Sequence, residues 1–201
     1  MKILIAIINN KNELALPFVK SLFELESHTR KKHDVDMRFF NAHEVNIMRN
    51  IACKHAIENN YDYIFQMDSD MTYPKESIIE LLKMRKPVTT GHYRARFPPF
   101  LPIHYKKIGK NILDQQNRTF TQEIEQIEAT GGGGVLIDVN ILKKLKFPYY
   151  ETKYKGHNIK SEDIVFSEKL KKKKIPIFLN TKIDYGHLAN FQVNQKGIIP
   201  Q

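Results

Sequence analysis

The stretch YDYIFQMDSDMTYPKESIIELLK, residues Tyr61–Lys83, joins a strand-like run to a helix-like run. Its first part, Tyr61–Met67, has the length and apolar content of a buried strand, and Pro74 suits the first turn of the helix that follows. Two carboxylates, Asp68 and Asp70, lie between these elements. Ligands of open α/β sheets bind beyond the carboxyl ends of the strands. The stretch therefore predicts both a strand and a binding site at its end.

Two further strands, each followed by a helix, are predicted before this stretch. Lys2–Ile8 (KILIAII) is a continuous apolar run, as in a buried parallel strand, and Val35–Phe40 is the second strand. Apolar residues recur at helical spacing over about residues 14–28 and over residues 46–60, where Asn46 is placed to cap the helix. The order β-α-β-α-β-α predicts a parallel sheet with helices on both faces. The second helix is expected to bury a face made of Ile47, Ile51, Ala52, Ala56 and Ile57.

The second half of the chain breaks this alternation. A proline-rich, aromatic stretch, KPVTTGHYRARFPPFLPIHYKK, is followed by a strand that leads into four glycines, Gly131–Gly134. VLIDVNILKKLK changes from strand to short helix, a helix capped by Ser161 begins at Glu162, and Ile175–Thr181 (IPIFLNT) is the last strand. The chain shows no obvious linker, so we expect one domain over residues 1–201, with little pattern after Phe191, where a mobile tail is expected.

Composition narrows the class of protein. The chain has 32 Lys and Arg against 22 Asp and Glu, a net charge of +10, which indicates either an anionic partner or a lysine-rich, solvated surface. The single cysteine, Cys53, excludes an internal disulfide and suits a reducing compartment. No run approaches the roughly 18 apolar residues of a membrane span, and the N-terminus is typical of a strand rather than a signal peptide. We therefore expect a cytoplasmic protein without a transmembrane segment.

The paired aspartates have two interpretations. Side chains two residues apart on an extended segment point the same way, so Asp68 and Asp70 repel one another unless a cation lies between them. Their oxygen atoms suit Mg²⁺ or Mn²⁺. The alternative is an ordinary turn before a helix, where aspartate is common.

Three other stretches also have both a functional and a purely structural interpretation. The glycines Gly131–Gly134 allow close approach of the backbone to a ligand, or form a flexible hairpin. Glu162 and Asp163 are candidate catalytic carboxylates, or simply favour the positive end of a helix. His187, in DYGHLAN after the last strand, is a candidate metal ligand or an ordinary loop histidine.

The order of these stretches resembles that of glycosyltransferases with the GT-A fold. The resemblance runs from ILIAIINN to GHLAN, and MRN (Met48–Asn50), MDSDMTYP and GHYRARFPP are similar to small viral and bacterial members. It implies an α/β fold with a Rossmann-like, mostly parallel central sheet and flanking helices. Residues 1–90 would form the nucleotide-binding half, and residues 91–190 the acceptor and metal half. We expect no C-terminal extension of the kind that forms an acceptor platform in larger members, so the resemblance leaves the acceptor open.

The resemblance also implies roles on the donor side. Asp70 would bind the divalent cation, Mn²⁺ or Mg²⁺, directly, and Asp68 would bind the donor ribose or reach the cation through water. His187 would be the third protein ligand. Asn9 would contact the nucleobase and Arg49 the donor. The resemblance also places Ser69, which lies between the two aspartates, on the donor side.

The implied reaction moves a sugar, typically a hexose, from a nucleoside-diphosphate sugar to a carbohydrate or other hydroxyl acceptor. The glycines Gly131, Gly132, Gly133 and Gly134 would lie beside the donor sugar and the acceptor. Glu162 and Asp163 match the acidic pair of the family. Asp163 would remove the acceptor proton in an inverting enzyme and hold the sugar in a retaining one. Arg94 and Arg96 are candidates to stabilise the leaving diphosphate.

Two other classes remain as alternatives. A nucleotidyltransferase of related fold typically has a glycine-rich signature with Lys or Arg after its first strand, but IINNKNELALP contains no glycine. A nucleic-acid-binding protein would explain the net charge of +10 and the aromatic, basic stretch GHYRARFPPFLPIHYKK. The sequence shows no helix-turn-helix, zinc-ligand spacing or RNA-binding signature for that class.

Overall fold

The structure is a computed structural model that describes residues 1–11, 13–108, 112–114, 122–156, 158–189, 191–194 and 197–200. Its helices are α1 (Leu16–Arg30), α2 (Val45–Glu58), α3 (Ser77–Lys83), α4 (Val139–Leu142) and α5 (Glu162–Lys172). The central sheet contains β1 (Lys2–Ile8), β2 (Asp34–Phe40), β3 (Tyr63–Asp68), β5 (Val88–His92), β8 (Ile124–Ile127), β10 (Val135–Asp138) and β13 (Ile177–Asp184).

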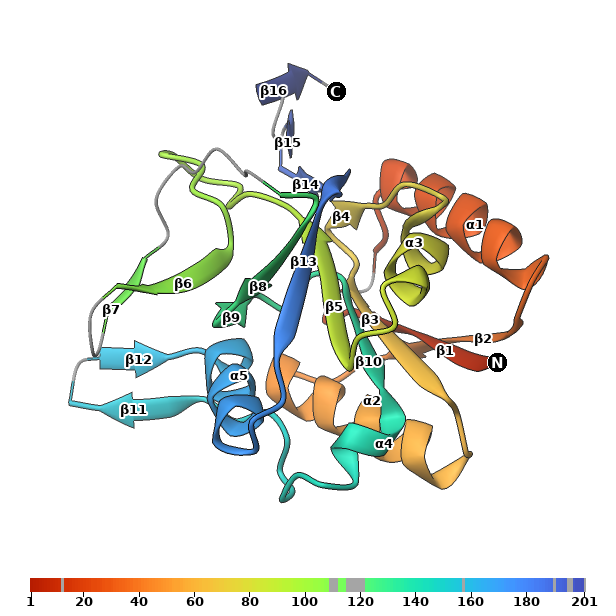
Figure 1. Cartoon of the computed structure of the whole chain (residues 1–201). Coiled ribbons are helices and arrows are strands. Elements are labelled where there is room, and N and C mark those ends of the chain that lie inside the picture. The colour runs from red at the N-terminus through yellow and green to blue at the C-terminus, as the bar shows by residue number, and fades with distance from the viewer. Residues whose placement is uncertain are drawn as a thin grey trace.

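The central sheet has seven strands in the order β2-β1-β3-β10-β5-β13-β8 (Figure 1). β1 pairs in parallel with β2 and β3, and β13 pairs in parallel with β5. β10 runs antiparallel between β3 and β5, and β8 runs antiparallel along β13. The expected mostly parallel sheet is confirmed, with two reversed strands that come from the second half of the chain.

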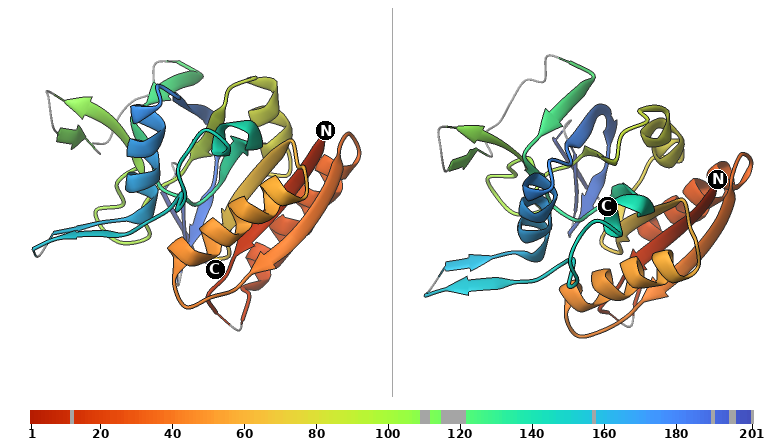
Figure 2. Two further views of the ribbon diagram at one scale, coloured as in Figure 1. Left: turned by 90° about the horizontal axis from the view of Figure 1, so that it is seen from below. Right: turned by 60° about the horizontal axis from the view of Figure 1, so that its bottom comes forward.

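Helices cover both faces of this sheet, as Figures 1 and 2 show. On one face, residues of α1 and α3 pack against Ile3, Ile5 and Ile7 of β1. On the other face, residues of α2, α4 and α5 pack against the alternate residues of β1. Both faces are buried, which is why β1 is a continuous apolar run rather than an alternating one. The predicted two-sided helix cover is confirmed.

The buried face of α2 differs from the expected one. Ile47 and Ile51 are 43% and 49% exposed, whereas Arg49 and Asn50 are buried. The Asn50 side chain explains part of this, because its amide bonds the backbone of Tyr150. The helix begins at Val45 after Glu44, so Asn46 is not its cap. The prediction was wrong for Ile47 and Ile51, where buried polar residues take the inner positions, but Ala52 and Ala56 are buried as expected and Ile57 packs against the same core.

Smaller sheets complete the fold. β6 (His104–Ile108) joins β7 (Ile112–Asp114) and β9 (Ala129–Thr130), and a separate hairpin pairs β11 (Lys153–Lys155) with β12 (Asn158–Lys160). A four-stranded sheet contains β4 (Met71–Thr72), β14 (Gly186–Leu188), β15 (Phe191–Asn194) and β16 (Gly197–Pro200).

Two strands therefore stand where the sequence suggested a tail with little pattern. β15 pairs with β14 and β16 pairs with β15, both antiparallel. The rest of the expected tail, residues 195–196 and 201, lies outside the described residues. In the described part of the chain, none of the helices is long and apolar enough to cross a membrane.

Two histidines lie in the interior, at the end of β5 and the start of β6. His92 is 1% exposed and His104 is 7% exposed, with ring centroids 5.3 Å apart. The backbone N–H of Tyr93 donates to Nε2 of His104 at 3.2 Å, so this ring must be neutral at that nitrogen. Burial lowers the pKa of His92 to about 4 and the pKa of His104 well below its usual range.

We expect these two histidines to make the fold sensitive to acid. The unfolded chain takes up protons near pH 6.5 and the folded chain does not, so stability is retained above about pH 6.5 and falls toward pH 4. Each histidine contributes up to about 1.4 kcal/mol per pH unit in this window. Urea unfolding from pH 7.5 to 4.5 measures the slope, which His104→Gln should reduce and His43→Gln, at an exposed position, should not. Equal slopes in all three proteins would contradict this assignment.

Candidate functional site

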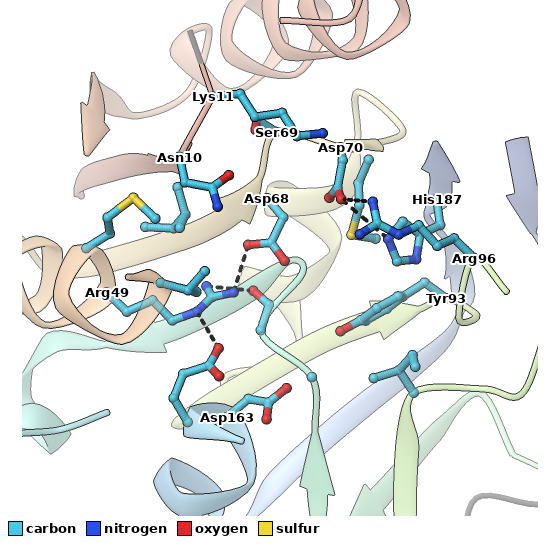
Figure 3. A pocket seen from close by; sticks show the side chains of 18 residues that line it. Asn10, Lys11, Arg49, Asp68, Ser69, Asp70, Tyr93, Arg96, Asp163 and His187 are labelled. Atoms are coloured by element: carbon cyan, nitrogen blue, oxygen red, sulfur yellow. Dashed lines mark hydrogen bonds and ion pairs between the residues drawn. The ribbon is translucent and has the colours of Figure 1, made fainter. Parts of the chain in front are cut away.

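A cavity of about 370 Å³ lies at the edge of the sheet where β1 and β3 end. It gathers most of the residues that the sequence singled out (Figure 3). Those that line it are Arg49, Asp68, Ser69, Asp70, Gly131, Gly132, Glu162, Asp163 and His187. Four predicted residues do not line it: Asn9, Arg94, Gly133 and Gly134.

Strand order explains why these distant stretches meet. Ile8 of β1 lies beside Asp68 of β3, so the residues that follow both strands emerge at one edge. β10 is antiparallel to β3, and its first residue, Val135, lies opposite Gln66. The glycines that precede β10 are thereby brought next to the aspartates. The single reversed strand between β3 and β5 thus builds the site.

Arg49 of α2 links three of these stretches. Its guanidinium donates to Asp68 Oδ1 at 2.7 Å, to Glu162 Oε1 at 3.4 Å and to the carbonyl of Gly132 at 3.0 Å. The side chain is 2% exposed. Burial opposes its charge, but the neighbouring carboxylates outweigh that cost and raise the pKa of Arg49 above its usual range. The fixed fork of an arginine suits such a junction better than a lysine.

The two aspartates have different environments. Burial raises the pKa of Asp68, although the charge of Arg49 opposes this shift. Asp70 accepts from Arg96 Nη1 at 2.7 Å through its Oδ2 atom. Burial also disfavours the charged form of Asp70, but His187 and Arg96 outweigh it and lower its pKa. At neutral pH Asp70 is therefore an anion, and the guanidinium of Arg96 pairs with it.

His187, the middle residue of β14, is held in a defined orientation. Its Nδ1 lies 2.9 Å from the backbone carbonyl of Arg94, which only accepts hydrogen bonds, so Nδ1 carries a proton. In a neutral ring, Nε2 then presents its lone pair toward Asp70 Oδ2, 3.8 Å away. A lone pair facing a carboxylate favours a positive species between them. Metal-bound histidines usually have this backing by a carbonyl.

Asp70 and His187 lie close enough together to share a divalent cation. Two ligand atoms about 2.1 Å from one ion stand at most about 4.2 Å apart, and the observed 3.8 Å lies within that limit. Asp68 is turned toward Arg49 instead. Among the described residues, no group of three or more His, Cys, Asp and Glu side chains is arranged to hold a metal. A cation here would need further ligands from a substrate, as Mg²⁺ sites commonly take them from phosphates.

The two carboxylates of α5 are used differently. Glu162 faces Arg49, and burial raises its pKa. Asp163 points into the cavity (Figure 3). Its Oδ1 accepts from the hydroxyl of Ser161 and, at 2.7 Å, from the backbone N–H of Ile164. Within the part of the chain that the structure describes, Oδ2 has no hydrogen-bond donor, so one oxygen of Asp163 is available to a ligand.

Asn9 stabilises the loop after β1 through hydrogen bonds and does not line the cavity. Asn9 Oδ1 accepts from the backbone of Lys11 at 3.1 Å and from the hydroxyl of Ser69 at 2.9 Å. Its Nδ2 donates to the carbonyl of Lys11 at 2.7 Å. The next two residues, Asn10 and Lys11, line the cavity instead. Asn9 therefore ties the loop to the aspartate turn, and Lys11 brings a positive charge to the cavity.

The four glycines are close-packed against the protein. A Cβ atom on Gly132 would overlap the guanidinium of Arg49, and one on Gly131 would overlap the hydroxyl of Tyr93. Gly133 lies against Met71. Gly134 has a φ of +123°, a backbone conformation that residues with a side chain rarely adopt. The backbone of this segment must therefore approach neighbouring groups closely. Those neighbours are protein side chains that line the cavity, rather than a ligand.

Gly132→Ala is expected to displace Arg49 and so disturb the whole site. Overpacking of this kind costs about 1–3 kcal/mol. Urea unfolding should show that loss, and any ligand affinity of the site should fall with it. Gly156→Ala is a matched control, because Gly156 has no atom within 4 Å of the added carbon but has a φ of +59°, so it reports backbone strain alone. A Gly132→Ala protein as stable as the wild type would contradict the packing account.

Two cavity residues had weaker signals in the sequence. Tyr93, after β5, is 3% exposed, and its hydroxyl accepts from the N–H of Gly133 at 3.2 Å. Burial raises its pKa well above the usual value, so the hydroxyl stays protonated. Arg96 lines the cavity, whereas Arg94 does not. No spacing rule distinguishes the two arginines, because a tight loop decides which one points inward.

Comparison with known proteins gives the fold. No family model matches this sequence, and neither does any curated protein sequence. The crystal structure of A197 from STIV is 17% identical and has a TM-score of 0.71 over 100% of this chain and 94% of its own.

Two enzyme structures are more distant. The 4-diphosphocytidyl-2C-methyl-D-erythritol synthase of Anaerococcus prevotii DSM 20548 is 9% identical, with a TM-score of 0.48 over 88% of this chain and 85% of its own. A UDP-glucose pyrophosphorylase from Acinetobacter baumanii is 6% identical, with a TM-score of 0.42 over 83% of this chain and 61% of its own. At these identities the comparisons carry no function to this chain, and the likeness to A197 shows that the two proteins share a fold.

Proposed function

We propose that the chain is a metal-dependent glycosyltransferase of the GT-A type that moves a sugar from a nucleoside-diphosphate sugar to an acceptor hydroxyl. The observation that carries this proposal is the composition of one cavity. It combines the aspartate pair Asp68 and Asp70, the cations Lys11 and Arg96, and a carboxylate, Asp163, with an available oxygen. An anionic diphosphate and a hydroxyl that must lose a proton both find suitable partners there.

The aspartate side of the cavity would take the donor. Asp70 and His187 would hold Mn²⁺ or Mg²⁺ together with the diphosphate, and the cation would act as a Lewis acid on the leaving group. Lys11 and Arg96 would neutralise further charge on the diphosphate. Asp68, fixed by Arg49, would accept a hydrogen bond from a donor hydroxyl, as carboxylates do.

The α5 side of the cavity would take the acceptor. Asp163 Oδ2 would accept the proton of the attacking hydroxyl, while Ser161 and the N–H of Ile164 hold its other oxygen in place. Glu162 would act through Arg49 rather than on the substrate. The base is thus separated from the donor carboxylate by the glycine segment and Arg49, which keeps the two halves of the reaction at fixed positions.

Thermal unfolding with a panel of nucleosides, nucleoside diphosphates and nucleoside triphosphates, each with and without Mn²⁺, tests this assignment. A ligand at 100 times its Kd stabilises by about 2.7 kcal/mol. We expect one nucleoside diphosphate to raise Tm, and to raise it further with Mn²⁺. Stabilisation by triphosphates alone would favour the nucleotidyltransferase alternative, and no stabilisation by any nucleotide would contradict a donor site.

His187→Ala is expected to raise the Mn²⁺ concentration needed for half-maximal transfer by about tenfold, or about 1.4 kcal/mol. The reason is the loss of one of two protein ligands that lie 3.8 Å apart. His43→Ala, at an exposed position, is the control. An unchanged Mn²⁺ titration would remove His187 from the cation site and leave Asp70 with the nucleotide and water.

A further inference from the structure

The loop between β5 and β6 contacts both protein ligands of the proposed cation site, His187 and Asp70. The backbone carbonyl of Arg94 orients His187, and the side chain of Arg96 pairs with Asp70. The loop is closed on itself, with a bridge between Arg94 and Pro102 and a hydrogen bond from Ala95 to Leu101. Arg96 is therefore delivered to the cavity by a defined turn.

Arg96 uses the same oxygen that the cation would need. Its Nη1 is 2.7 Å from Asp70 Oδ2, and this atom is also the one that lies 3.8 Å from His187 Nε2. A cation bound between this oxygen and His187 would therefore compete with the guanidinium for Asp70 Oδ2. Asp70 and Arg96 keep 28% and 36% of their side-chain surface exposed, so the guanidinium is free to leave toward the cavity.

We propose that Arg96 is an exchangeable counterion: it holds Asp70 in the free protein and passes to the diphosphate when the donor and the cation bind. The proposal rests on the proposed function and adds a coupling between the two ligands. Phosphate oxygens are strong partners for a guanidinium, often through two hydrogen bonds, and offer Arg96 a better site than a shared carboxylate oxygen. The cation alone must displace Arg96 without that compensation, so it binds weakly until the diphosphate is present.

The exchange predicts opposite effects of one substitution on two ligands. Arg96→Met should tighten binding of Mn²⁺ in the absence of nucleotide by about fivefold or more, which corresponds to about 1 kcal/mol. The same variant should weaken binding of the nucleoside diphosphate without metal. Loss of an ordinary binding residue weakens binding of the ligand that it contacts, and it does not tighten binding of a second ligand.

Calorimetric titration of Mn²⁺ into the wild-type protein, Arg96→Met, Arg96→Lys and Lys11→Met tests the exchange without any assay of transfer. Arg96→Lys keeps a cation for Asp70 and should behave nearly like wild type. Lys11→Met removes a positive charge from the same cavity, and in the described residues Lys11 forms no ion pair with Asp70. It reports general charge alone, for which we expect less than about twofold tightening.

The outcomes separate this inference from the proposed function. Tightening in Arg96→Met but not in Lys11→Met supports the exchange. An unchanged or weaker Kd for Mn²⁺ in Arg96→Met, or equal tightening in Lys11→Met, overturns it while leaving a metal-dependent enzyme in place. If no variant binds Mn²⁺ at millimolar concentration, with or without nucleoside diphosphate, the metal-dependent function fails together with the exchange.

Discussion

Asp163→Asn is expected to lower kcat by about 10²–10⁴-fold while the Kd of the nucleoside diphosphate changes by less than about twofold. The amide has the shape of the carboxylate but does not accept the proton of the acceptor hydroxyl. Asp163 lies at the start of α5, on the far side of Arg49 from the aspartates, so the donor contacts should survive. Steady-state kinetics and nucleotide titration of the same preparation measure the two effects.

Glu162→Gln is the matched control for this prediction. It alters the neighbouring carboxylate of the same helix turn, but Glu162 faces Arg49 and not the acceptor. We expect a smaller loss of kcat and a larger loss of stability than in Asp163→Asn. A large loss of nucleotide affinity in Asp163→Asn, with kcat preserved, would move Asp163 to the donor side and refute its role as the base.

Arg49→Met is expected to destabilise the fold by about 3–5 kcal/mol and to abolish transfer. Removing one partner of a buried ionic cluster leaves the others without compensation, which costs this much in other proteins. Asp68 and Glu162 would be left facing one another beside the carbonyl of Gly132. Urea unfolding measures the stability, and Arg49→Lys should lie between the two proteins because it keeps the charge and loses the fork.

A triple variant distinguishes charge from packing in this cluster. Arg49→Met combined with Asp68→Asn and Glu162→Gln removes all three charges at once, and uncharged replacements of buried ion clusters are often well tolerated. We expect the triple variant to regain stability relative to Arg49→Met and to remain inactive. A triple variant less stable than Arg49→Met would show that Arg49 acts through shape alone.

The sequence predicted the frame of the fold well, for physical reasons. β1 is buried on both faces, so its apolar run is continuous, and the helices after β1 and β2 carry regular apolar spacing. Such patterns depend on nearby residues only. The reversed course of β10 and β8 had no local signal, because the choice of partner strand depends on contacts between distant segments.

The site was predicted in part. Asp68, Asp70, Asp163 and His187 were singled out by their order along the chain, since each one alone also had an ordinary structural explanation, and the structure places all four around one cavity. The contacts of Arg49 were not found, since its partners Asp68 and Glu162 are 19 and 113 residues away. Periodicity counts apolar residues, so it placed isoleucines on the inner face of α2 where the structure has buried polar side chains.

The most direct test of the account is analysis of the reaction products. The wild-type protein is incubated with Mn²⁺, each of a panel of nucleoside-diphosphate sugars and a mixture of simple sugar acceptors, and the products are identified by mass spectrometry. We predict release of a nucleoside diphosphate with a matching glycosylated acceptor, both lost in Asp163→Asn. Release of pyrophosphate from a nucleoside triphosphate and a sugar phosphate, with no glycosyl transfer from any donor, would contradict the account.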